Sequence, residues 1–425
     1  MTDPRAKIAE GIAEWCRANH DYSFDPANPV VRLHEPTFGA EEIDAAVECL
    51  LTTRITMGPK VKGFEADFKA HLGTTNATMV NSGSSANLLA IAALANPETR
   101  DALRPGDEVI VPALSWSTTV WPLVQMGLVP VIVDIDRDTL NIDPNEVERA
   151  IGPKTRAVMP VHVYGNPCDM DALTDICQRR GLTLIEDGCE ALGASYGGTP
   201  VCRFGRVGTF SFYYSHHITT LEGGICVSDD FELAETMRIL RAHGWVREVE
   251  DKKRWTDRYP DIHERFLFVN LGYNLRATDV QGAFGSVQLP KLAGLVRQRQ
   301  ALAAYWRDAL ARFRQFIAPQ EITPKGDHSW MSFAIKLEPA APFTSAELMG
   351  WLEKAGIETR PIICGNVARQ PGMKLYPHRA VGDLARADAI MDRAFSIGCH
   401  QGVDDAARAY VAETFARFFA ARGLA

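Results

Sequence analysis

The sequence predicts an α/β protein with a mainly parallel central sheet flanked by helices, and a smaller α+β region at the C-terminal end. Two observations support this prediction. From about Val61 to Gln288, short apolar runs rich in valine and isoleucine alternate with helical segments, and after Pro290 a long helical stretch leads into a mixed pattern. Strands that alternate with helices favour a parallel sheet, because parallel neighbours need a crossover that a helix usually provides.

Residues 1–50 are expected to form an arm and a helix. Ile8, Ile12 and Trp15 recur near helical spacing within residues 5–18, before a proline-containing stretch at 25–36. This pattern predicts an amphipathic helix. We therefore expect three parts: the arm and helix at 1–50, a large ligand-binding domain at 51–288 and a small C-terminal domain at 289–425.

The runs expected to form strands share an absence of polar alternation. They are Glu108–Pro112, Val129–Val133, Ala157–Val163 and Leu182–Ile185. Such runs are typical of strands that helices cover on both faces, and in such a sheet ligands bind beyond the carboxyl ends of the strands. The charged stretch Glu248–Glu264 has no apolar period and predicts an exposed loop.

Composition and charge restrict the class of protein. The 425 residues are 46% hydrophobic and 23% charged, with a net charge of −8. A globular protein is expected, and without a basic run it is unsuited to nucleic acid or an acidic membrane surface. No segment has signal-peptide or membrane-spanning character, so we expect a cytoplasmic location. The nine cysteines lack tight ligand spacing, which favours free thiols and no metal site.

Three segments could carry chemistry, and the first is NSGSSAN at Asn81–Asn87. It follows an apolar run and precedes a helical one, so Gly83, Ser84 and Ser85 would place N–H groups and a hydroxyl at a helix N-terminus. This arrangement favours phosphate binding, although an ordinary helix cap would use the same residues. The chain has no GxxxxGK[ST] motif and no GxGxxG after a first strand, which argues against nucleotide hydrolysis and dinucleotide redox chemistry.

The second segment begins where the expected strand Leu182–Ile185 ends. Glu186 and Asp187 follow directly, and Glu190 comes three residues later. A strand-end carboxylate can pair with the protonated nitrogen of a pyridine cofactor, and Asp187 is the candidate for this role. A solvated aspartate at a strand end is the simpler alternative.

The third segment is Gly208–Asp230. Ser211 ends a strand-like run, His216 and His217 stand side by side, and Glu222–Gly224 predicts a turn before another apolar strand. Neighbouring side chains of an extended chain point to opposite sides, so the two histidines are not expected to chelate a metal. A lone histidine is often structural, but a pKa near neutrality also suits it to moving a proton.

Together the three segments resemble the sugar aminotransferase-like family (DegT/DnrJ/EryC/StrS) of fold-type I enzymes, which depend on pyridoxal 5'-phosphate (PLP). The resemblance rests on the order of phosphate turn, strand-end aspartate, serine and EGG, and includes SWSTT at Ser115–Thr119 and LGYNLRATDVQGA at Leu271–Ala283. It runs from about Val31 to the C-terminal region. The fold that it implies is that of aspartate aminotransferase.

The chain departs from the aminotransferase pattern at His216, which stands where the family has its PLP-binding lysine. In this it is similar to nucleotide-sugar 3-dehydratases, which use pyridoxamine 5'-phosphate (PMP) with a histidine base. RAHGW at Arg241–Trp245 and RPIICGN at Arg360–Asn366 resemble the colitose-type dehydratases, which act on a GDP-linked sugar. An iron–sulfur relative acting on a CDP-sugar has clustered cysteines after the EGG strand, whereas Arg241–Phe266 contains none.

The resemblance implies His216 as the catalytic base and a set of cofactor-binding residues. That set is Gly83, Ser84, Trp116, Asp187, Glu190, Ser211 and Asn274. Trp116 would stack on the pyridine ring, and Asn274 would reach the cofactor phosphate from a second subunit, so a homodimer with shared active sites is implied. Arg247 and Arg360 are further candidates, for the diphosphate of the substrate, although exposed arginines are usually only solvated.

The implied activity removes the C3 hydroxyl of a nucleotide-linked 4-keto-6-deoxyhexose to give a 4-keto-3,6-dideoxy sugar, with L-glutamate restoring PMP. One alternative is a sugar aminotransferase that works with histidine, but the lysine that normally frees the amino product is missing. A second alternative is a binding protein of the same fold without catalysis. The retained Asp187, Ser211, Trp116 and Asn274 argue against it.

Overall fold

The computed structural model describes residues 3–424, in which the largest sheet has eight strands. In spatial order these are β1 (Asn76–Val80), β9 (Gly224–Ser228), β8 (Val207–Ser211), β5 (Thr183–Asp187), β4 (Thr155–Val158), β2 (Glu108–Pro112), β3 (Val129–Val133) and β14 (Arg379–Ala380). Strand β9 runs antiparallel to β1 and β8, whereas the pairs from β8 to β14 are parallel. The predicted mainly parallel sheet is confirmed.

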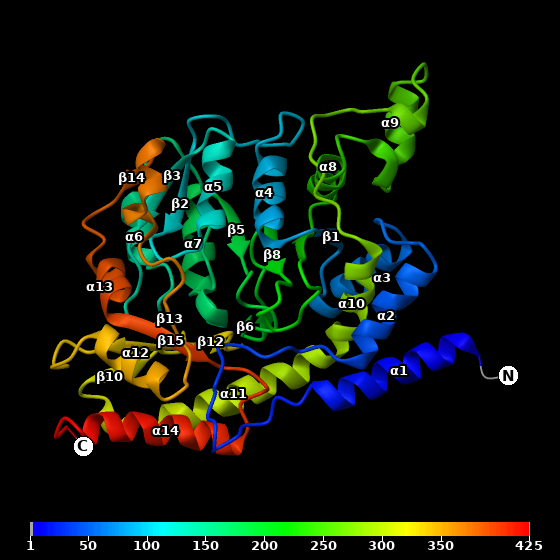
Figure 1. Cartoon of the computed structure of the whole chain (residues 1–425). Helices are drawn as coiled ribbons and strands as arrows, with labels where there is room; N and C mark the ends of the chain where they lie inside the picture. The colour runs from blue at the N-terminus through cyan, green and yellow to red at the C-terminus, as the bar shows by residue number, and fades with distance from the viewer. Residues whose placement is uncertain (1–2, 425) are drawn as a thin grey trace.

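Helices cover both faces of this sheet (Figure 1). One face packs against α4 (Gly83–Leu94), α5 (Ser117–Gln125), α8 (Phe231–Arg241) and α13 (Ala385–Arg393), and the other against α6 (Pro144–Ala150) and α7 (Met170–Arg180). Along β2, Val109 and Val111 join the first core while Ile110 joins the second. Burial on both faces therefore explains why the strands lack polar alternation.

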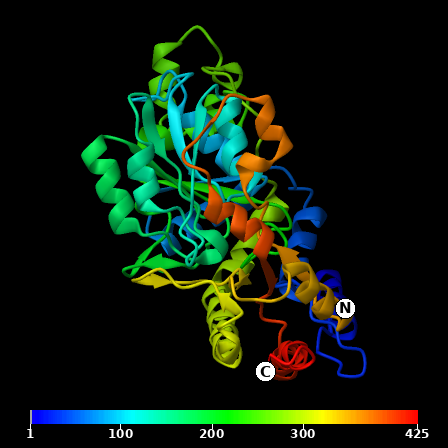
Figure 2. The same cartoon turned by 90° about the vertical axis from the view of Figure 1, so that its left-hand side faces the viewer.

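A second layer lies below the large sheet and contains an antiparallel sheet of four strands. In spatial order they are β10 (Ile317–Pro319), β12 (Ser332–Leu337), β15 (Ala394–Gly398) and β13 (Thr359–Pro361). This sheet shares a core with α11 (Leu292–Ala309), α12 (Ser345–Lys354) and α14 (Asp405–Ala420). Figures 1 and 2 both show α11 and α14 along the lower edge of the molecule.

Further α-helices and a third sheet lie outside these two sheets. They are α1 (Pro4–Asn19), α2 (Ala40–Leu51), α3 (Pro59–Leu72), α9 (Lys252–Arg258), α10 (Asp279–Gln288) and a small sheet of β11 (Gly326–Asp327), β6 (Ser195–Tyr196) and β7 (Thr199–Pro200). The predicted N-terminal helix is confirmed, and the Asp3 side chain caps it by accepting a hydrogen bond from Arg5 N. Within residues 3–424, none of the helices combines the length and the hydrophobicity needed to cross a bilayer.

Two sequence expectations were wrong in detail. The expected strand Ala157–Val163 ends at Val158, because the chain continues through Pro160 into a 3₁₀ turn, η1 (Val163–Gly165). The expected loop Glu248–Glu264 contains helix α9, which Asp251 caps at its N-terminus. Trp255 is the buried residue of α9 and packs in a small separate core. Because a helix with a single buried residue has no repeating apolar pattern, the sequence did not reveal it.

Candidate active site

A cavity of about 400 Å³ lies at the carboxyl ends of the central strands, next to the four-stranded sheet. Its wall includes Ser82–Ser84 after β1, Asp187 at the end of β5, Ser211 at the end of β8, and Arg360 from β13. The carboxyl ends of parallel strands meet at one edge of a sheet, so residues far apart in sequence converge there. The cavity therefore contains most of the residues that the sequence singled out.

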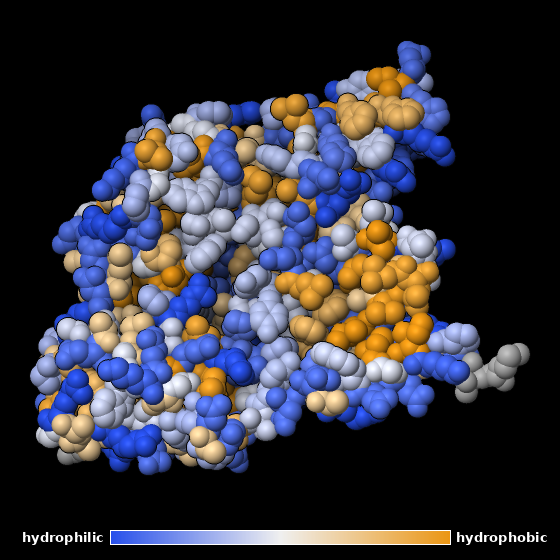
Figure 3. Space-filling model, viewed as in Figure 1, coloured by the Kyte–Doolittle hydropathy of each residue, from blue (hydrophilic) through white to orange (hydrophobic). Residues whose placement is uncertain are grey.

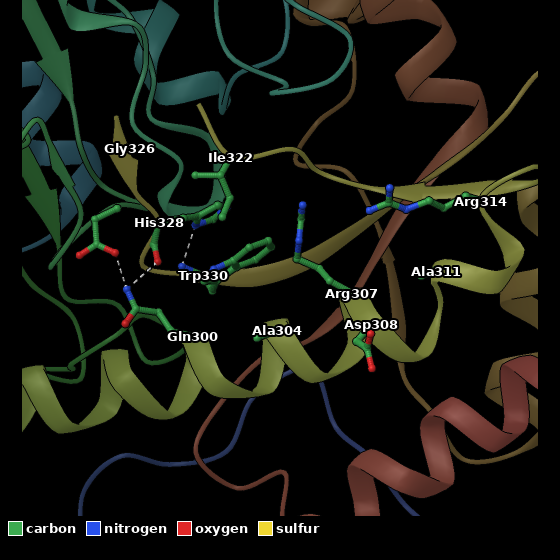
Figure 4. Close-up of a pocket in the computed structure, with 11 residues that line it drawn as sticks. Gln300, Ala304, Arg307, Asp308, Ala311, Arg314, Ile322, Gly326, His328 and Trp330 are labelled. Carbon is green, nitrogen blue, oxygen red and sulfur yellow. Dashed lines mark hydrogen bonds between the residues drawn. The ribbon is translucent and has the colours of Figure 1, made fainter. Parts of the chain in front are cut away.

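A larger hollow of about 530 Å³ runs along α11 and contains none of those residues (Figure 4). Two of its polar side chains, Gln300 and Arg307, already bind neighbouring groups. Gln300 Nε2 donates to Asp327 Oδ1 and to the carbonyl oxygen of His328, and Arg307 pairs with Glu321 at 2.7 Å. Because this hollow contains none of the residues with candidate chemistry, the cavity at the strand ends is the better candidate for catalysis.

The loop after β1 brings backbone N–H groups to the cavity. Ser82 caps helix α4 by accepting from Ser85 N at 3.0 Å, and Gly83 is the first helical residue. A Cβ atom on Gly83 would lie 2.5 Å from Ser211 Cβ, so only glycine allows this close approach. The predicted phosphate-binding residues Gly83, Ser84 and Ser211 thus meet at a helix N-terminus, where an anion is favoured.

The carboxylate of Asp187 is buried and held by three donors. Its Oδ2 atom accepts from Asn87 Nδ2 and from Thr119 Oγ1, both at 2.8 Å, and Oδ1 accepts from Cys189 N at 3.1 Å. These three donors hold the carboxylate in one orientation at the cavity wall. Asp187 can therefore face a cationic ring nitrogen in the cavity.

His216 lines the cavity, whereas His217 does not. Burial, together with the guanidinium groups of Arg299 and Arg360, lowers the pKa of His216 to about 3, rather than leaving it near neutrality. The imidazole is therefore uncharged and able to accept a proton. Its Nδ1 atom is buried without a partner, so Nε2 is the nitrogen that faces the cavity.

The two histidines face different sides, as expected, but for a different reason. They lie in a bend after β8 and not in a strand. His217 is fully buried, and its Nε2 atom is 3.1 Å from the carbonyl oxygen of Ser329. Burial lowers the pKa of His217 well below its usual value, so this ring is a neutral structural group.

Glu190 also lines the cavity, and its carboxylate accepts a 2.9 Å hydrogen bond from Tyr164 N. Burial raises the pKa of Glu190 to about 7, which the bond from Tyr164 only partly offsets. A carboxyl group with this pKa can hold or release a proton near neutral pH.

An aromatic ring and a cation complete the wall. Trp116 immediately precedes α5 and remains 45% exposed inside the cavity, where a flat ligand can stack on its ring. The Arg360 Cζ atom lies 5.9 Å from the centre of that ring, so the guanidinium is close to any such ligand.

Two predicted residues do not line this cavity. Asn274 is exposed on the segment before α10, where its Oδ1 atom accepts from Arg276 Nε at 3.0 Å. Arg247 borders a separate hollow beside Trp245 and α9. Within one chain, neither residue is part of the cavity wall that contains His216.

Sequence reasoning missed several residues of the site. Asn87, Thr119, Tyr164 and Tyr213 line the cavity with the residues already described. The centre of the Tyr213 ring lies 5.9 Å from that of His216, at an interplanar angle of 88°. A polar Asn87 next to the apolar run of α4 was a usable signal, because a buried amide needs a partner.

Residues 36–416 match the DegT/DnrJ/EryC1/StrS aminotransferase family. The chain belongs to this family. Among its relatives, the GDP-4-keto-6-deoxy-D-mannose 3-dehydratase of Yersinia pseudotuberculosis is 39% identical over 372 residues, covering 87% of this chain and 94% of the relative. The dTDP-4-dehydro-2,6-dideoxy-D-glucose 3-dehydratase of Saccharopolyspora spinosa is 35% identical over 431 residues, covering 99% and 93%.

A solved structure of a family member agrees with the fold. The structure of E. coli GDP-4-keto-6-deoxy-D-mannose-3-dehydratase with bound hydrated PLP has a TM-score of 0.85 to this chain, with 37% sequence identity. The match covers 90% of this chain and 98% of that one. The expected aspartate-aminotransferase fold of this family member is confirmed.

Proposed function

We propose that this family member is a PMP/PLP-dependent 3-dehydratase that removes the C3 hydroxyl of a nucleotide-linked 4-keto-6-deoxyhexose. The observation that carries the proposal is His216, a neutral imidazole facing the cavity where the family has its PLP-binding lysine. The two relatives described above are both named as 3-dehydratases, although one name contains GDP and the other dTDP. For this chain we propose a GDP-linked sugar, because the GDP-sugar relative has the higher identity.

The residues of the cavity fit a pyridine cofactor with a phosphate. The N-terminus of α4 with Ser84 and Ser211 fits the phosphate, and the close contact of Gly83 with Ser211 keeps side chains out of that space. The hydrogen-bonded carboxylate of Asp187 fits the ring nitrogen, and the open face of Trp116 fits the ring.

When bound, the cofactor supplies an amino group for the C4 ketone of the sugar and a ring that accepts electrons. Asp187 keeps the ring nitrogen protonated. His216 accepts a proton from the cofactor carbon at C4' through Nε2 and delivers a proton to the departing C3 hydroxyl. Glu190, with a pKa of about 7, lies where it can share a proton with the cofactor or the sugar.

The atoms balance with L-glutamate as the amino donor, which is our proposal for this chain. One 4-keto-6-deoxyhexose and one glutamate give one 4-keto-3,6-dideoxyhexose, one 2-oxoglutarate and one ammonia. No iron is needed in this scheme, and Arg241–Phe266 contains no cysteine to ligate a cluster. Retention of the amino group on the sugar is disfavoured because no lysine lines the cavity to displace it.

We also propose a homodimer in which each active site uses both chains. Figure 3 shows a broad hydrophobic area over the region where Figure 1 places α2, α3 and α10. Leu50, Leu51 and Ile55 there are 58%, 54% and 46% exposed, and Leu271, three residues before Asn274, is 89% exposed. An area of this kind is typical of a subunit interface. A second chain covering it can bring Asn274 to the cofactor phosphate.

The remaining assignments follow from this scheme. Arg360 lies beside Trp116 and is proposed to bind substrate within its own chain, whereas Arg247 would bind the substrate diphosphate from the partner chain.

We also propose a cytoplasmic location and a division of the chain into an arm and helix at 1–50, a large domain at 51–288 and a small domain at 289–425. In the structure, however, β14 pairs with β3, so the C-terminal third contacts both layers.

The proposed reaction can be tested with purified protein, PMP and L-glutamate. GDP-, CDP- and dTDP-linked 4-keto-6-deoxyhexoses are supplied in separate reactions, and the mass of each sugar product is measured by mass spectrometry. We expect the GDP-linked sugar to lose one oxygen atom, with ammonia and 2-oxoglutarate formed in equal amounts. A product that keeps its C3 oxygen and gains an amino group would instead identify an aminotransferase.

A further inference from the structure

Tyr164 makes contacts that none of the roles above explain. It is 4% exposed, and its backbone is left-handed, with φ 55° and ψ 22°. Such a conformation is uncommon for a residue other than glycine and is retained where surrounding contacts require it. The residue lies in η1, directly after Val163, where the expected strand Ala157–Val163 would have ended.

The left-handed backbone of Tyr164 lets one residue bind two parts of the site. Its N–H donates to Glu190 Oε2 at 2.9 Å, and its carbonyl oxygen accepts from Met331 N at 2.8 Å. Both Glu190 and Met331 line the cavity. In an ordinary strand conformation the N–H and the carbonyl oxygen of Tyr164 would point in other directions. The left-handed backbone is therefore what allows both hydrogen bonds.

The phenol of Tyr164 reaches the segment that carries Arg360. Its oxygen accepts from Ile363 N at 3.2 Å and lies 3.4 Å from Ser396 Oγ. Ser396 Oγ in turn donates to the carbonyl oxygen of Arg360 at 3.4 Å, and these two residues face each other in the pairing of β13 with β15. The hydroxyl therefore connects to both ends of residues 360–363.

The direction of these hydrogen bonds follows from the groups involved. Ile363 N can only donate and the Arg360 carbonyl can only accept, so the Tyr164 hydroxyl donates to Ser396 and the Ser396 hydroxyl donates to Arg360. Burial raises the pKa of Tyr164 to about 12, so the phenol keeps its proton across the working range of pH.

We propose that Tyr164 is a positioning residue: its hydroxyl fixes residues 360–363, and thereby the place of the Arg360 guanidinium, while its N–H fixes Glu190. The part that concerns substrate rests on the proposed function, since Arg360 is taken there to bind the sugar nucleotide. The part that concerns residues 360–363 does not, because it depends only on the hydrogen bonds described.

The test uses Tyr164→Phe, which removes the hydroxyl and keeps the ring and the backbone N–H. Tyr196→Phe is the matched control, because Tyr196 is 5% exposed and its hydroxyl bonds to Asp169 and Asp171 at 3.0 and 3.2 Å, away from the cavity. Hydrogen–deuterium exchange is measured on peptides covering residues 360–366. We expect exchange about threefold to tenfold faster in Tyr164→Phe, as for the loss of one hydrogen bond, and no change in the control.

A kinetic measurement tests the connection to Arg360. In the wild-type background, Tyr164→Phe should raise KM for the nucleotide sugar about threefold to tenfold and leave kcat within about twofold. In the Arg360→Gln background, Tyr164→Phe should raise KM no further, because the group that it positions is gone. Ser396→Ala should also speed exchange at residues 360–366 and provides a second variant if Tyr164→Phe folds poorly.

Unchanged exchange at residues 360–366 in both variants would overturn the role of Tyr164. An equal increase in KM with and without Arg360 would also overturn it. If the wild-type protein dehydrates none of the sugars, the proposed function fails, but the exchange result still decides whether Tyr164 positions this segment.

Discussion

The side-chain amide of Asn87 donates a 2.8 Å hydrogen bond to Asp187 Oδ2, although the two residues lie 100 positions apart. Thr209 Oγ1 donates to Asn87 Oδ1 at 2.6 Å, which fixes the orientation of the amide. Thr119 donates to the same oxygen of Asp187 from α5. The geometry of the Asp187 carboxylate therefore depends on helices α4 and α5 as well as on its own strand.

Asn87→Ala should weaken PLP binding about tenfold, because a charge-assisted hydrogen bond is worth about 1.5–3 kcal/mol and the carboxylate also loses its fixed orientation. Affinity is measured by titrating the protein, freed of cofactor, with PLP and following absorbance. Asn96→Ala is the control, since Asn96 is a buried amide whose side chain pairs with Asn270 outside the cavity. Equal PLP affinity in Asn87→Ala and wild type would show that the amide does not support Asp187.

His216→Lys should bind PLP covalently. The lysine amine can form a carbon–nitrogen double bond with the PLP aldehyde, and borohydride should then fix the cofactor to the peptide containing residue 216, as seen by mass spectrometry. Dehydration should fall about 100-fold or more, which is the usual contribution of a positioned acid–base group.

Two variants control for this assignment. His216→Asn should lose activity without trapping PLP. His217→Ala should be milder in kcat but should destabilise the fold by about 1–3 kcal/mol, because it removes a buried ring that contacts the Ser329 carbonyl. If His217→Ala abolished turnover while His216→Asn retained it, His216 would not be the base.

Glu190→Gln should stabilise the cofactor-free protein at alkaline pH. The pKa of Glu190 is raised to about 7 in the folded chain, so the folded state holds this proton more tightly than the unfolded state. The contribution of Glu190 to the stability of the fold is therefore greatest below its unfolded pKa of about 4.3, and this contribution is lost as pH rises through 7. Glutamine has no such dependence, and its oxygen can still accept from Tyr164 N.

As pH rises from 5 to 8.5, we therefore expect the free energy of unfolding of Glu190→Gln to increase by about 1–2 kcal/mol relative to that of wild type. This is less than the full pKa shift of Glu190 implies, because the cavity admits water. Thermal unfolding at both pH values measures this difference. A gap between the two proteins that stays constant with pH would mean that Glu190 ionises normally in the folded chain.

Mixed dimers should reveal the role of Asn274. His216→Asn and Asn274→Ala chains are each expected to be nearly inactive, but a mixed dimer would contain one site with both wild-type residues. Refolding the two chains together should restore activity to about a quarter of the wild-type sites, since half of the dimers are mixed. No recovery, although mass measurements show that mixed dimers have formed, would mean that Asn274 and His216 serve the same chain.

The sequence by itself determined the fold class and predicted the main chemistry. Strands such as β2 are apolar at successive positions because helices cover both faces of the sheet, and this burial is visible in the sequence. The turn at Gly83, the strand-end Asp187 and the histidine at 216 lie in local motifs, so their order predicted a PLP-type enzyme with a histidine in place of the usual lysine.

Only the tertiary structure decided which distant residues act together. Asn87 meets Asp187, and Tyr164 meets Glu190 and Ile363, because the strand ends and the second sheet converge at one cavity. The tertiary structure also placed Arg360 beside Trp116 in the cavity and Arg247 at a different hollow. No sequence pattern could distinguish these two arginines. The low pKa of His216 likewise results from burial and from two nearby arginines. Burial depends on how the layers of the fold pack together, and the residues next to His216 in the sequence do not determine it.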